Sequence, residues 1–155
     1  VTRVLDGDTL KVSRDGKPVT VRLAGIDAPE NSQPAGSLAR TFTGALAYQQ
    51  TVTVTVGTTD RYRRLVGTVH LWDGRNLSHE LVRMGLAWHY KQYAPADATL
   101  AALEKEARIA KRGLWALPNP VAPWDWRKGK RGTISPKERT TYGRGTPCRR
   151  LGARQ

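Results

Sequence analysis

Hydrophobic and polar residues alternate along much of the first half of the chain, a period of two that predicts β-strands. The clearest case is TVTVTV at residues 51–56, and residues 1–12 and 18–26 have the same strand-like character. Asp15-Gly16 lies between these last two segments and predicts a hairpin turn. With a further strand at residues 65–72, the pattern predicts four or five short strands.

Apolar residues recur at helical spacing in three later segments. The first follows Ser37, a candidate cap, the second is capped by Asn76 or Ser78, and the third begins near Asp97. Residues 118–126, rich in proline and tryptophan, predict an extended segment. The sequence thus predicts an α+β fold, a five-stranded antiparallel β-barrel with about three α-helices at one end.

The charge of the chain narrows the choice of barrel. Lys and Arg number 26 against 13 Asp and Glu, a formal net charge of +13. Such a field favours a polyanionic partner, most often nucleic acid, with an anionic membrane surface as the lesser alternative. The Greek-key OB-fold is the small barrel that most often combines basic charge with nucleic-acid binding, so we expect an OB-fold.

The composition changes near the C-terminal end. Residues 129–155 contain eight Lys or Arg and one Glu, with few apolar residues, and we expect them to form a disordered basic tail. This tail either adds non-specific affinity for a polyanion or is a passive extension. Residues 1–128 retain 18 basic against 12 acidic residues and are expected to form the single folded domain.

Two classes of protein are disfavoured by composition. A single cysteine, Cys148, excludes an intrachain disulfide, and its Gly- and Arg-rich surroundings argue against a catalytic thiol. No apolar stretch reaches the roughly 18 residues of a membrane-spanning helix. The chain begins inside an apparent strand with no signal peptide, so we expect a mature or trimmed form whose export is not visible from this sequence.

An acidic pair interrupts the first strand-like segment, VLDGDTLKV at residues 4–12. Asp-Gly is a strong turn signal, so Asp6 and Asp8 alone favour a hairpin. Two neighbouring carboxylates also repel unless a cation lies between them. The spacing does not match an EF-hand loop, and the choice between a turn and a site depends on the rest of the chain.

A second polar cluster ends the next strand, RLAGIDAPE at residues 22–30. Arg22 and Asp27 would face opposite sides of a regular strand, but the intervening Gly25 permits a bulge that turns both toward one pocket. Pro29 stiffens the loop that carries Glu30. With Arg64 from DRYRR, these residues would supply carboxylates for a hard cation and arginines for a phosphate, the groups needed for attack by water on a phosphodiester.

Four segments, VLDGDTLKV, RLAGIDAPE, DRYRRLVG and LVRMGLAW, resemble the staphylococcal nuclease (thermonuclease) family in order and spacing, over residues 1–126. The resemblance implies that Asp8, Asp27 and the carbonyl of Ala28 bind calcium, while Asp6 lies near the ion without binding it directly. It implies further roles as catalytic residues for Glu30, as general base or water-orienting group, and for Arg22 and Arg64, as phosphate-binding groups, and Tyr62 is expected to lie near the nucleotide's phosphate.

Two departures from the family pattern bear on the site. The family's Tyr-Gly-Arg is here Tyr62-Arg63-Arg64, so Arg63 would be strained by about 1 kcal/mol if its φ is positive, and it is itself an outside candidate for the phosphate clamp. The residue that stacks on the base is either Tyr90 or Tyr93, between which spacing does not choose.

The resemblance implies a monomeric, calcium-dependent nuclease, a hydrolase that cleaves DNA and RNA with little sequence preference and leaves 3′-phosphorylated products. It requires no membrane and no obligate protein partner, and it implies secretion or a periplasmic location. The alternatives are a non-catalytic OB-fold nucleic-acid-binding module and, less favoured, a scaffold domain whose basic tail does the binding. None of the catalytic residue types is missing here, which favours the enzyme.

Overall fold

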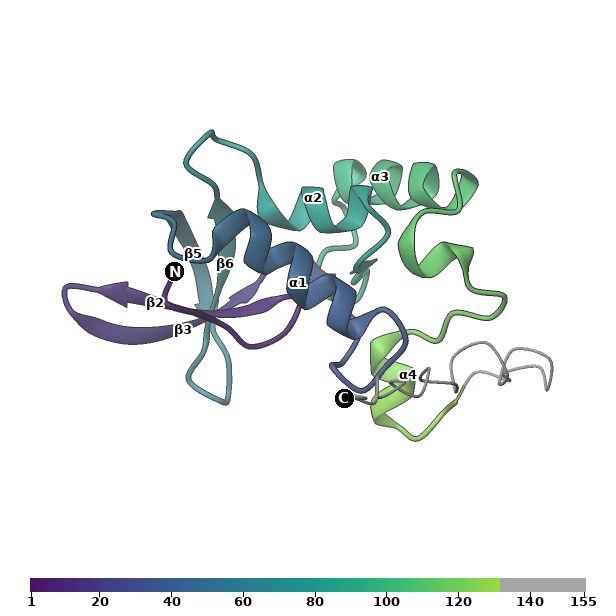
Figure 1. The fold of residues 1–155 in the computed structure, drawn as a ribbon, viewed down its shortest axis with the longest axis horizontal. Coiled ribbons are helices and arrows are strands. Elements are labelled where there is room, and N and C mark those ends of the chain that lie inside the picture. Colours follow the sequence, from purple (N-terminus) through teal and green to yellow (C-terminus); the bar gives the residue numbers. More distant parts are fainter. Residues whose placement is uncertain (132–155) are drawn as a thin grey trace, which may run out of the picture.

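The strands lie at one side of the molecule and most of the helical segments at the other, with a long helix crossing between them (Figure 1). The computed structural model describes residues 1–131. Five strands form one sheet in the order β1-β2-β3-β6-β5. They are β1 (Arg3–Val4), β2 (Thr9–Arg14), β3 (Lys17–Leu23), β6 (Leu65–His70) and β5 (Thr53–Thr59). A separate antiparallel pair joins β4 (Ile26–Asp27) to β7 (Trp88–His89).

The sheet is mixed, so the predicted all-antiparallel arrangement is wrong at one pair. β1–β2, β2–β3 and β5–β6 are antiparallel, whereas β3 and β6 are parallel, with Arg22 opposite Val66. A parallel pair needs a long crossover, and the chain between β3 and β6 supplies it through β4, a helix and β5. Strand alternation reports that a segment is extended but carries no information about its partner's direction.

The barrel is not closed by strand pairing. β1 and β5 are the two edges of the sheet, and they are not paired with each other. The segment just before β5 nevertheless reaches the start of β1, because the Gln49 amide donates to the Val1 carbonyl at 2.9 Å and the Val1 amino group donates to the Gln50 carbonyl at 2.6 Å. Backbone contacts therefore bring the sheet ends together where the OB-fold prediction expected a continuous barrel.

The described residues contain four α-helices, one more than expected. They are α1 (Gly36–Ala47), α2 (Leu77–Arg83), α3 (Ala98–Ile109) and α4 (Pro123–Arg127), with a 3₁₀ turn at Gly113–Ala116. Asn76 caps α2 through its side chain, as predicted, and Asp97, near which the third helix was expected to begin, caps α3 in the same way. The cap of α1 is Ala35 rather than Ser37, and α4 lies in a segment predicted to be extended.

The core lies between the sheet and α1, α2 and α3. Its largest fully buried side chains come from β2, β3, β4, α2 and α3, and include Leu10, Leu23, Ile26, Leu81 and Leu100. Hydrophobic positions of the predicted strands and helices thus share one core. It anchors the ends of β2 and β3, where the candidate site residues are placed.

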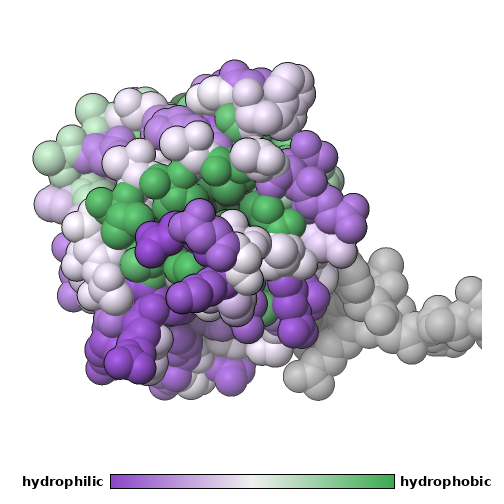
Figure 2. Space-filling view, turned by 90° about the vertical axis from the view of Figure 1, so that its left-hand side faces the viewer, coloured by the Kyte–Doolittle hydropathy of each residue, from purple (hydrophilic) through white to green (hydrophobic). Residues whose placement is uncertain are grey.

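A second apolar region faces solvent on the strand side. Seen from that side, hydrophobic residues gather in one area bordered by hydrophilic ones (Figure 2). A groove of about 660 Å³ is lined there by residues of β2, β3 and β5, including Val12, Val19, Val54 and Val56. It shares no lining residue with the larger groove described below.

Most of the expected basic tail, residues 132–155, lies outside the described residues, as does Cys148. Within residues 1–131, no helix combines the length and the hydrophobicity needed to cross a membrane.

Candidate active site

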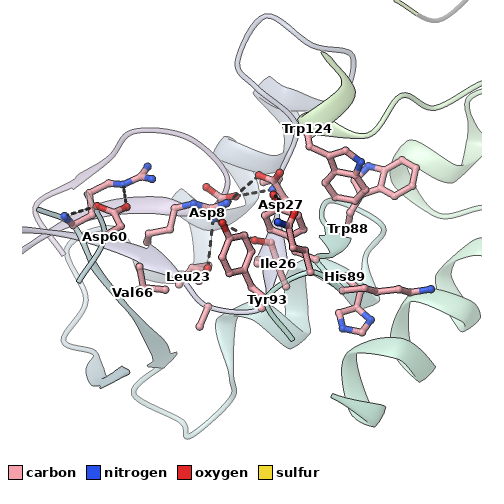
Figure 3. A pocket seen from close by; sticks show the side chains of 18 of the residues that line it. Asp8, Leu23, Ile26, Asp27, Asp60, Val66, Trp88, His89, Tyr93 and Trp124 are labelled. Atoms are coloured by element: carbon pink, nitrogen blue, oxygen red, sulfur yellow. Dashed lines mark hydrogen bonds and ion pairs between the residues drawn. The ribbon is translucent and has the colours of Figure 1, made fainter. Parts of the chain in front are cut away.

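A groove of about 1410 Å³ opens over the ends of β3, β4 and β6. In Figure 3, Asp8 and Asp27 lie in its middle, with Asp60 at one end and Trp88 and Trp124 at the other. Most charged side chains that line it are basic, and they are Arg22, Arg61, Arg64, Lys91, Arg108, Arg127 and Lys128. A concave surface with acids at its centre and a basic rim suits a polyanion that meets a cation.

The turn after β3 brings Arg22 and Asp27 together. Gly25 has a φ of +75°, a backbone conformation that L-residues rarely adopt, and the chain reverses there between β3 and β4. The Arg22 Nη2 atom consequently lies 3.0 Å from the Asp27 Oδ1 atom. The sequence prediction that a glycine would turn both residues toward one pocket is confirmed.

The parallel β3–β6 pair places Arg22 and Arg64 on one face of the sheet. Arg22 is opposite Val66, and side chains at paired positions share a face. Arg64 precedes Val66 by two positions and therefore points to that same face as the chain enters β6. Both arginines line the groove.

A tight turn at residues 60–64 holds Arg64. The Asp60 carboxylate accepts hydrogen bonds from the Tyr62 and Arg64 amides and from the Arg64 Nε atom at 2.6 Å. Burial is the largest single effect and raises the pKa of Asp60, but these hydrogen bonds together outweigh it and the pKa is lowered. The Arg64 Nη atoms have no partner among residues 1–131, so they can bind a phosphate. Arg63 has a φ of 63°, which confirms the expected strain at this position.

The acidic pair lies in a hairpin turn, because residues 5–8 join β1 to β2 and these strands pair antiparallel, with Val4 opposite Leu10. The single strand expected over residues 1–12 is therefore two strands, and the turn and the candidate site coincide. Gly7 lies so close to Ala28 and Ala39 that a Cβ at position 7 would approach each of their methyl groups to 2.8 Å. The Gly7 carbonyl accepts a hydrogen bond from the Thr43 hydroxyl of α1 at 2.6 Å. Position 7 therefore requires a glycine, because the backbone packs directly against Ala28 and α1. This packing holds Asp8 next to the residues that follow β4. A second hairpin turn, between β2 and β3, is at Asp15-Gly16, as predicted, with positive φ at both residues.

Arg22 lies between two buried carboxylates. Its Nη1 atom is 2.8 Å from Asp8 Oδ2, and its Nη2 atom binds Asp27. The Arg22 side chain is 14% exposed, while those of Asp8 and Asp27 are 7% and 2% exposed. Asp8 Oδ2 also accepts the Ala28 amide at 2.7 Å, so Ala28 lies beside both acids. Asp8 and Asp27, which are 19 positions apart in sequence, thus form one ion cluster with Arg22.

The acids outnumber the positive charges that reach them. Burial, followed by repulsion from Asp8, raises the pKa of Asp6 to about 7. Burial is also the main reason why the pKa of Asp27 is raised, although hydrogen bonds from Arg127 and the charge of Arg22 oppose it. Burial and repulsion from Asp8 both disfavour the ionised acids, and a bound cation would relieve this excess of negative charge.

This excess predicts that the metal-free protein loses stability as pH rises. Asp6 has a folded pKa of about 7, above its unfolded value of 3.8, so folding takes up a proton between these values. Its stabilising contribution is complete below pH 3.8 and is lost as pH rises toward and through 7. We expect the free energy of unfolding to fall by about 1–2 kcal/mol more between pH 5.5 and 7.5 in the parent than in Asp6→Asn, measured by urea denaturation. Equal pH dependence in the two proteins would contradict the assignment.

The donor set suits a hard cation that keeps part of its water shell. No group of three or more His, Cys, Asp or Glu side chains in residues 1–131 is arranged to hold a metal ion. Asp8 and Asp27 do share one arginine. Asp8 accepts two hydrogen bonds and pairs with Arg22, and Asp27 accepts three hydrogen bonds, out of about four that a carboxylate can accept. Two carboxylates with a backbone carbonyl and water are a ligand set that Ca²⁺ or Mg²⁺ accepts.

Glu30 lies at the edge of the cluster, with a side chain that is 37% exposed. Its carboxylate pairs with Arg127 of α4, a residue that sequence analysis did not select. The Arg127 Nη1 atom is 2.8 Å from Glu30 Oε1, and its Nη2 atom is 2.7 Å from Asp27 Oδ2. These hydrogen bonds raise the pKa of Arg127. Pro123 at the start of α4 was a usable helix signal, but nothing local indicates a contact across 97 residues.

The aromatic residues take different positions in the groove. Tyr62 is 64% exposed, with the guanidinium groups of Arg61 and Arg64 over its ring at 4.8 and 5.4 Å. Tyr90 stacks on Trp124, with ring centroids 5.0 Å apart and an interplanar angle of 5°. Tyr93 is 73% exposed, so it presents more open ring surface than Tyr90.

Known proteins resemble this chain over most of its length. A family model described as staphylococcal nuclease homologue matches residues 20–117. An Escherichia coli protein named uncharacterized endonuclease is 47% identical over 130 residues, which cover 84% of each chain. Micrococcal nuclease of Shigella flexneri is 41% identical over 144 residues, covering 87% of this chain and 83% of the relative.

The plant protein staphylococcal-like nuclease CAN1 of Arabidopsis thaliana is 42% identical over 116 residues. That match covers 75% of this chain but 35% of the plant protein. The family model ends before α4, so Arg127 lies outside the segment that it matches.

Proposed function

The chain belongs to the family of staphylococcal nuclease homologues, and on that premise we propose that it is a calcium-dependent nuclease acting on DNA and RNA. The observation that carries the proposal is the pair of buried carboxylates, Asp8 and Asp27, held on Arg22 at the centre of a basic groove. All the required groups come from one chain, which suits a monomer. The general activity in this proposal, hydrolysis of phosphodiesters, is supported by the relatives named as nucleases.

In this proposal Asp8, Asp27 and the Ala28 carbonyl hold the cation, and Asp6 contributes negative charge from beside it. When bound, calcium supplies positive charge at the scissile phosphate and lowers the pKa of a water molecule. Glu30, three residues after Asp27, accepts the proton of the attacking water. Its partial exposure leaves it reachable from the groove.

Two arginines then bind the charge that gathers on the phosphate in the transition state. Arg64 offers its Nη atoms, because Asp60 engages its Nε atom. Arg22 is largely engaged by Asp8 and Asp27, but no acceptor in residues 1–131 bonds to its Nε atom. Arg64 therefore binds the phosphate through its two Nη atoms. Arg22 holds Asp8 and Asp27 in place and binds the phosphate through its Nε atom.

The substrate chain would lie along the groove with its backbone on the basic rim. Tyr62 lies beside Arg64, which supports a contact between Tyr62 and the phosphate that Arg64 would bind. Tyr93, with the greater exposure, is the better candidate to stack on a base, and Tyr90 supports it at a centroid distance of 4.8 Å. Contacts of this kind read backbone and ring faces, so little sequence preference is expected.

Cleavage of labelled single strands tests this proposal. The protein with Ca²⁺ should cleave 5′-labelled single-stranded DNA and RNA at many positions and leave 3′-phosphate ends, which become extendable by a polymerase only after phosphatase treatment. Fluorescence anisotropy on the same oligonucleotides measures binding in parallel. Binding without cleavage would replace the enzyme with the alternative, a non-catalytic nucleic-acid-binding module.

A further inference from the structure

Arg127 connects two acids that have different proposed roles. Its Nη2 atom bonds to Asp27 Oδ2 at 2.7 Å, and its Nη1 atom bonds to Glu30 Oε1 at 2.8 Å and to Asp27 Oδ1 at 3.3 Å. One planar guanidinium therefore sets the separation of the two carboxylates. A lysine ammonium cannot hold two carboxylates in a fixed plane in this way.

The two acids differ in how firmly the rest of the protein holds them. Asp27 is in β4, pairs with β7 and also binds Arg22. Glu30 is in the irregular segment between β4 and α1, and within residues 1–131 its carboxylate has no partner other than Arg127. Arg127 thus ties the weakly held acid to the firmly held one.

The segment that carries Arg127 is itself docked on the Glu30 loop. The Gln33 side-chain amide donates to the Val121 carbonyl, just before α4. Within α4, Trp124 stacks on Tyr90 and meets the edge of Trp88 at a centroid distance of 5.7 Å. In Figure 3, Trp124 and Trp88 lie together at one end of the groove, on the side of Asp27 that faces away from Asp60. These contacts fix the base of the Arg127 side chain.

We propose that Arg127 is a positioning residue of the hydrolysis, and that residues 118–127, beyond the segment matched by the family model, complete the active site. The proposal rests on the function proposed above. Arg127 holds the Glu30 carboxylate beside Asp27, so that an attacking water lies between the acid that takes its proton and the cation. Because both Nη atoms of Arg127 are hydrogen-bonded to the carboxylates of Asp27 and Glu30, Arg127 acts through Glu30 rather than on the phosphate.

Steady-state cleavage of single-stranded DNA with Ca²⁺ tests the role in Arg127→Gln and Arg127→Lys. We expect kcat to fall about 10- to 100-fold in Arg127→Gln with KM within about threefold, because misplacement of a reacting group slows the chemical step. Arg127→Lys should recover only part of the loss. Added guanidinium ion should raise kcat of Arg127→Gly and leave the parent unchanged.

Arg131→Gln is the matched control. Arg131 contacts Trp126 and not the acids, so this change removes one positive charge four residues after Arg127 without affecting Asp27 or Glu30. Its kcat and KM should equal those of the parent. The thermal midpoints of all variants, measured by circular dichroism, should lie close together because the Arg127 side chain is 43% exposed.

Amide hydrogen exchange of residues 28–35 separates this inference from the proposed function, because it needs no activity. Exchange there should accelerate in Arg127→Gln and not in Arg131→Gln. An inactive parent with this exchange pattern would defeat the nuclease proposal while supporting the link between Arg127 and the Glu30 loop. The inference is overturned by unchanged exchange, by parental kcat in Arg127→Gln, or by a rise in KM alone, which would make Arg127 a phosphate-binding residue.

Discussion

Replacing Glu30 with glutamine is expected to lower kcat for single-stranded DNA by about 10²- to 10⁴-fold, the usual contribution of a general base. Glutamine keeps the shape and can still accept a hydrogen bond from Arg127, but it cannot take a proton from water. KM and the free energy of unfolding should change little, because the Glu30 side chain is 37% exposed. Initial rates over a range of substrate concentration, with Ca²⁺ in excess, give both constants.

Glu106→Gln controls for the loss of one carboxylate. Glu106 is on α3, 59% exposed and paired with Arg112, and it does not line the groove. Its variant should retain the parental kcat. If Glu30→Gln is as active as the parent, Glu30 is not the base, although the fold and the cation site would be unaffected by that result.

Replacing Arg22 with glutamine is expected to lower the free energy of unfolding by about 3–5 kcal/mol at pH 7, in addition to abolishing most activity. The change leaves Asp8 and Asp27 buried beside each other without the guanidinium that both contact. Saturating Ca²⁺ should restore part of the lost stability, because in the proposed site the ion would supply positive charge to the same two acids. Urea denaturation with and without Ca²⁺ measures both effects.

Arg64→Gln is the matched comparison, because it removes the other proposed phosphate-binding arginine. Arg64 pairs with Asp60 at a more open position, with side-chain exposures of 30% and 20%. Its stability cost should be about 0–1 kcal/mol, while kcat falls about 10²-fold or more. Equal losses of unfolding free energy in Arg22→Gln and Arg64→Gln would contradict this account, in which Arg22 bridges two buried acids and Arg64 is more exposed.

Local patterns predicted the parts of the fold that local chemistry decides. Alternation in residues 51–56 and positive φ at Asp15 and Gly16 correspond to β5 and to the β2–β3 hairpin. Asn76 and Asp97 cap helices because a short polar side chain satisfies free amides within its own turn. Each of these signals is complete within a few residues.

Two features of the sheet were not predicted: β6 runs parallel to β3, and the edge strands β1 and β5 do not pair to close a barrel. Both depend on pairing between strands distant in sequence, which local patterns do not report. The parallel pairing of Arg22 with Val66 is nevertheless what sets Arg64 on the same face as Arg22. The cap of α1 was placed two residues late, because Ala35, with a φ of 67°, replaces the side-chain cap that Ser37 suggested. In both cases tertiary contacts decided what propensity could not.

The candidate residues Asp8, Arg22, Asp27 and Glu30 were selected from sequence, and the structure brings them together through Gly7 and Gly25. Arg127 was missed because its partners lie 97 and 100 residues away, in a segment whose prolines and tryptophans suggested an extended chain. Its role in the cluster could be found only from the packing of α4 against the Glu30 loop.

A cation cycle on the unmodified protein tests most directly whether a metal ion held by Asp8 and Asp27 drives cleavage. Metal-free protein is mixed with labelled single-stranded DNA, then Ca²⁺ is added, removed with excess chelator and restored, while binding and cleavage are followed in the same sample. We predict that cleavage starts, stops and resumes with Ca²⁺, and that Asp27→Asn abolishes the response. Cleavage that continues at the same rate in chelator, or binding without cleavage at every step, would contradict it.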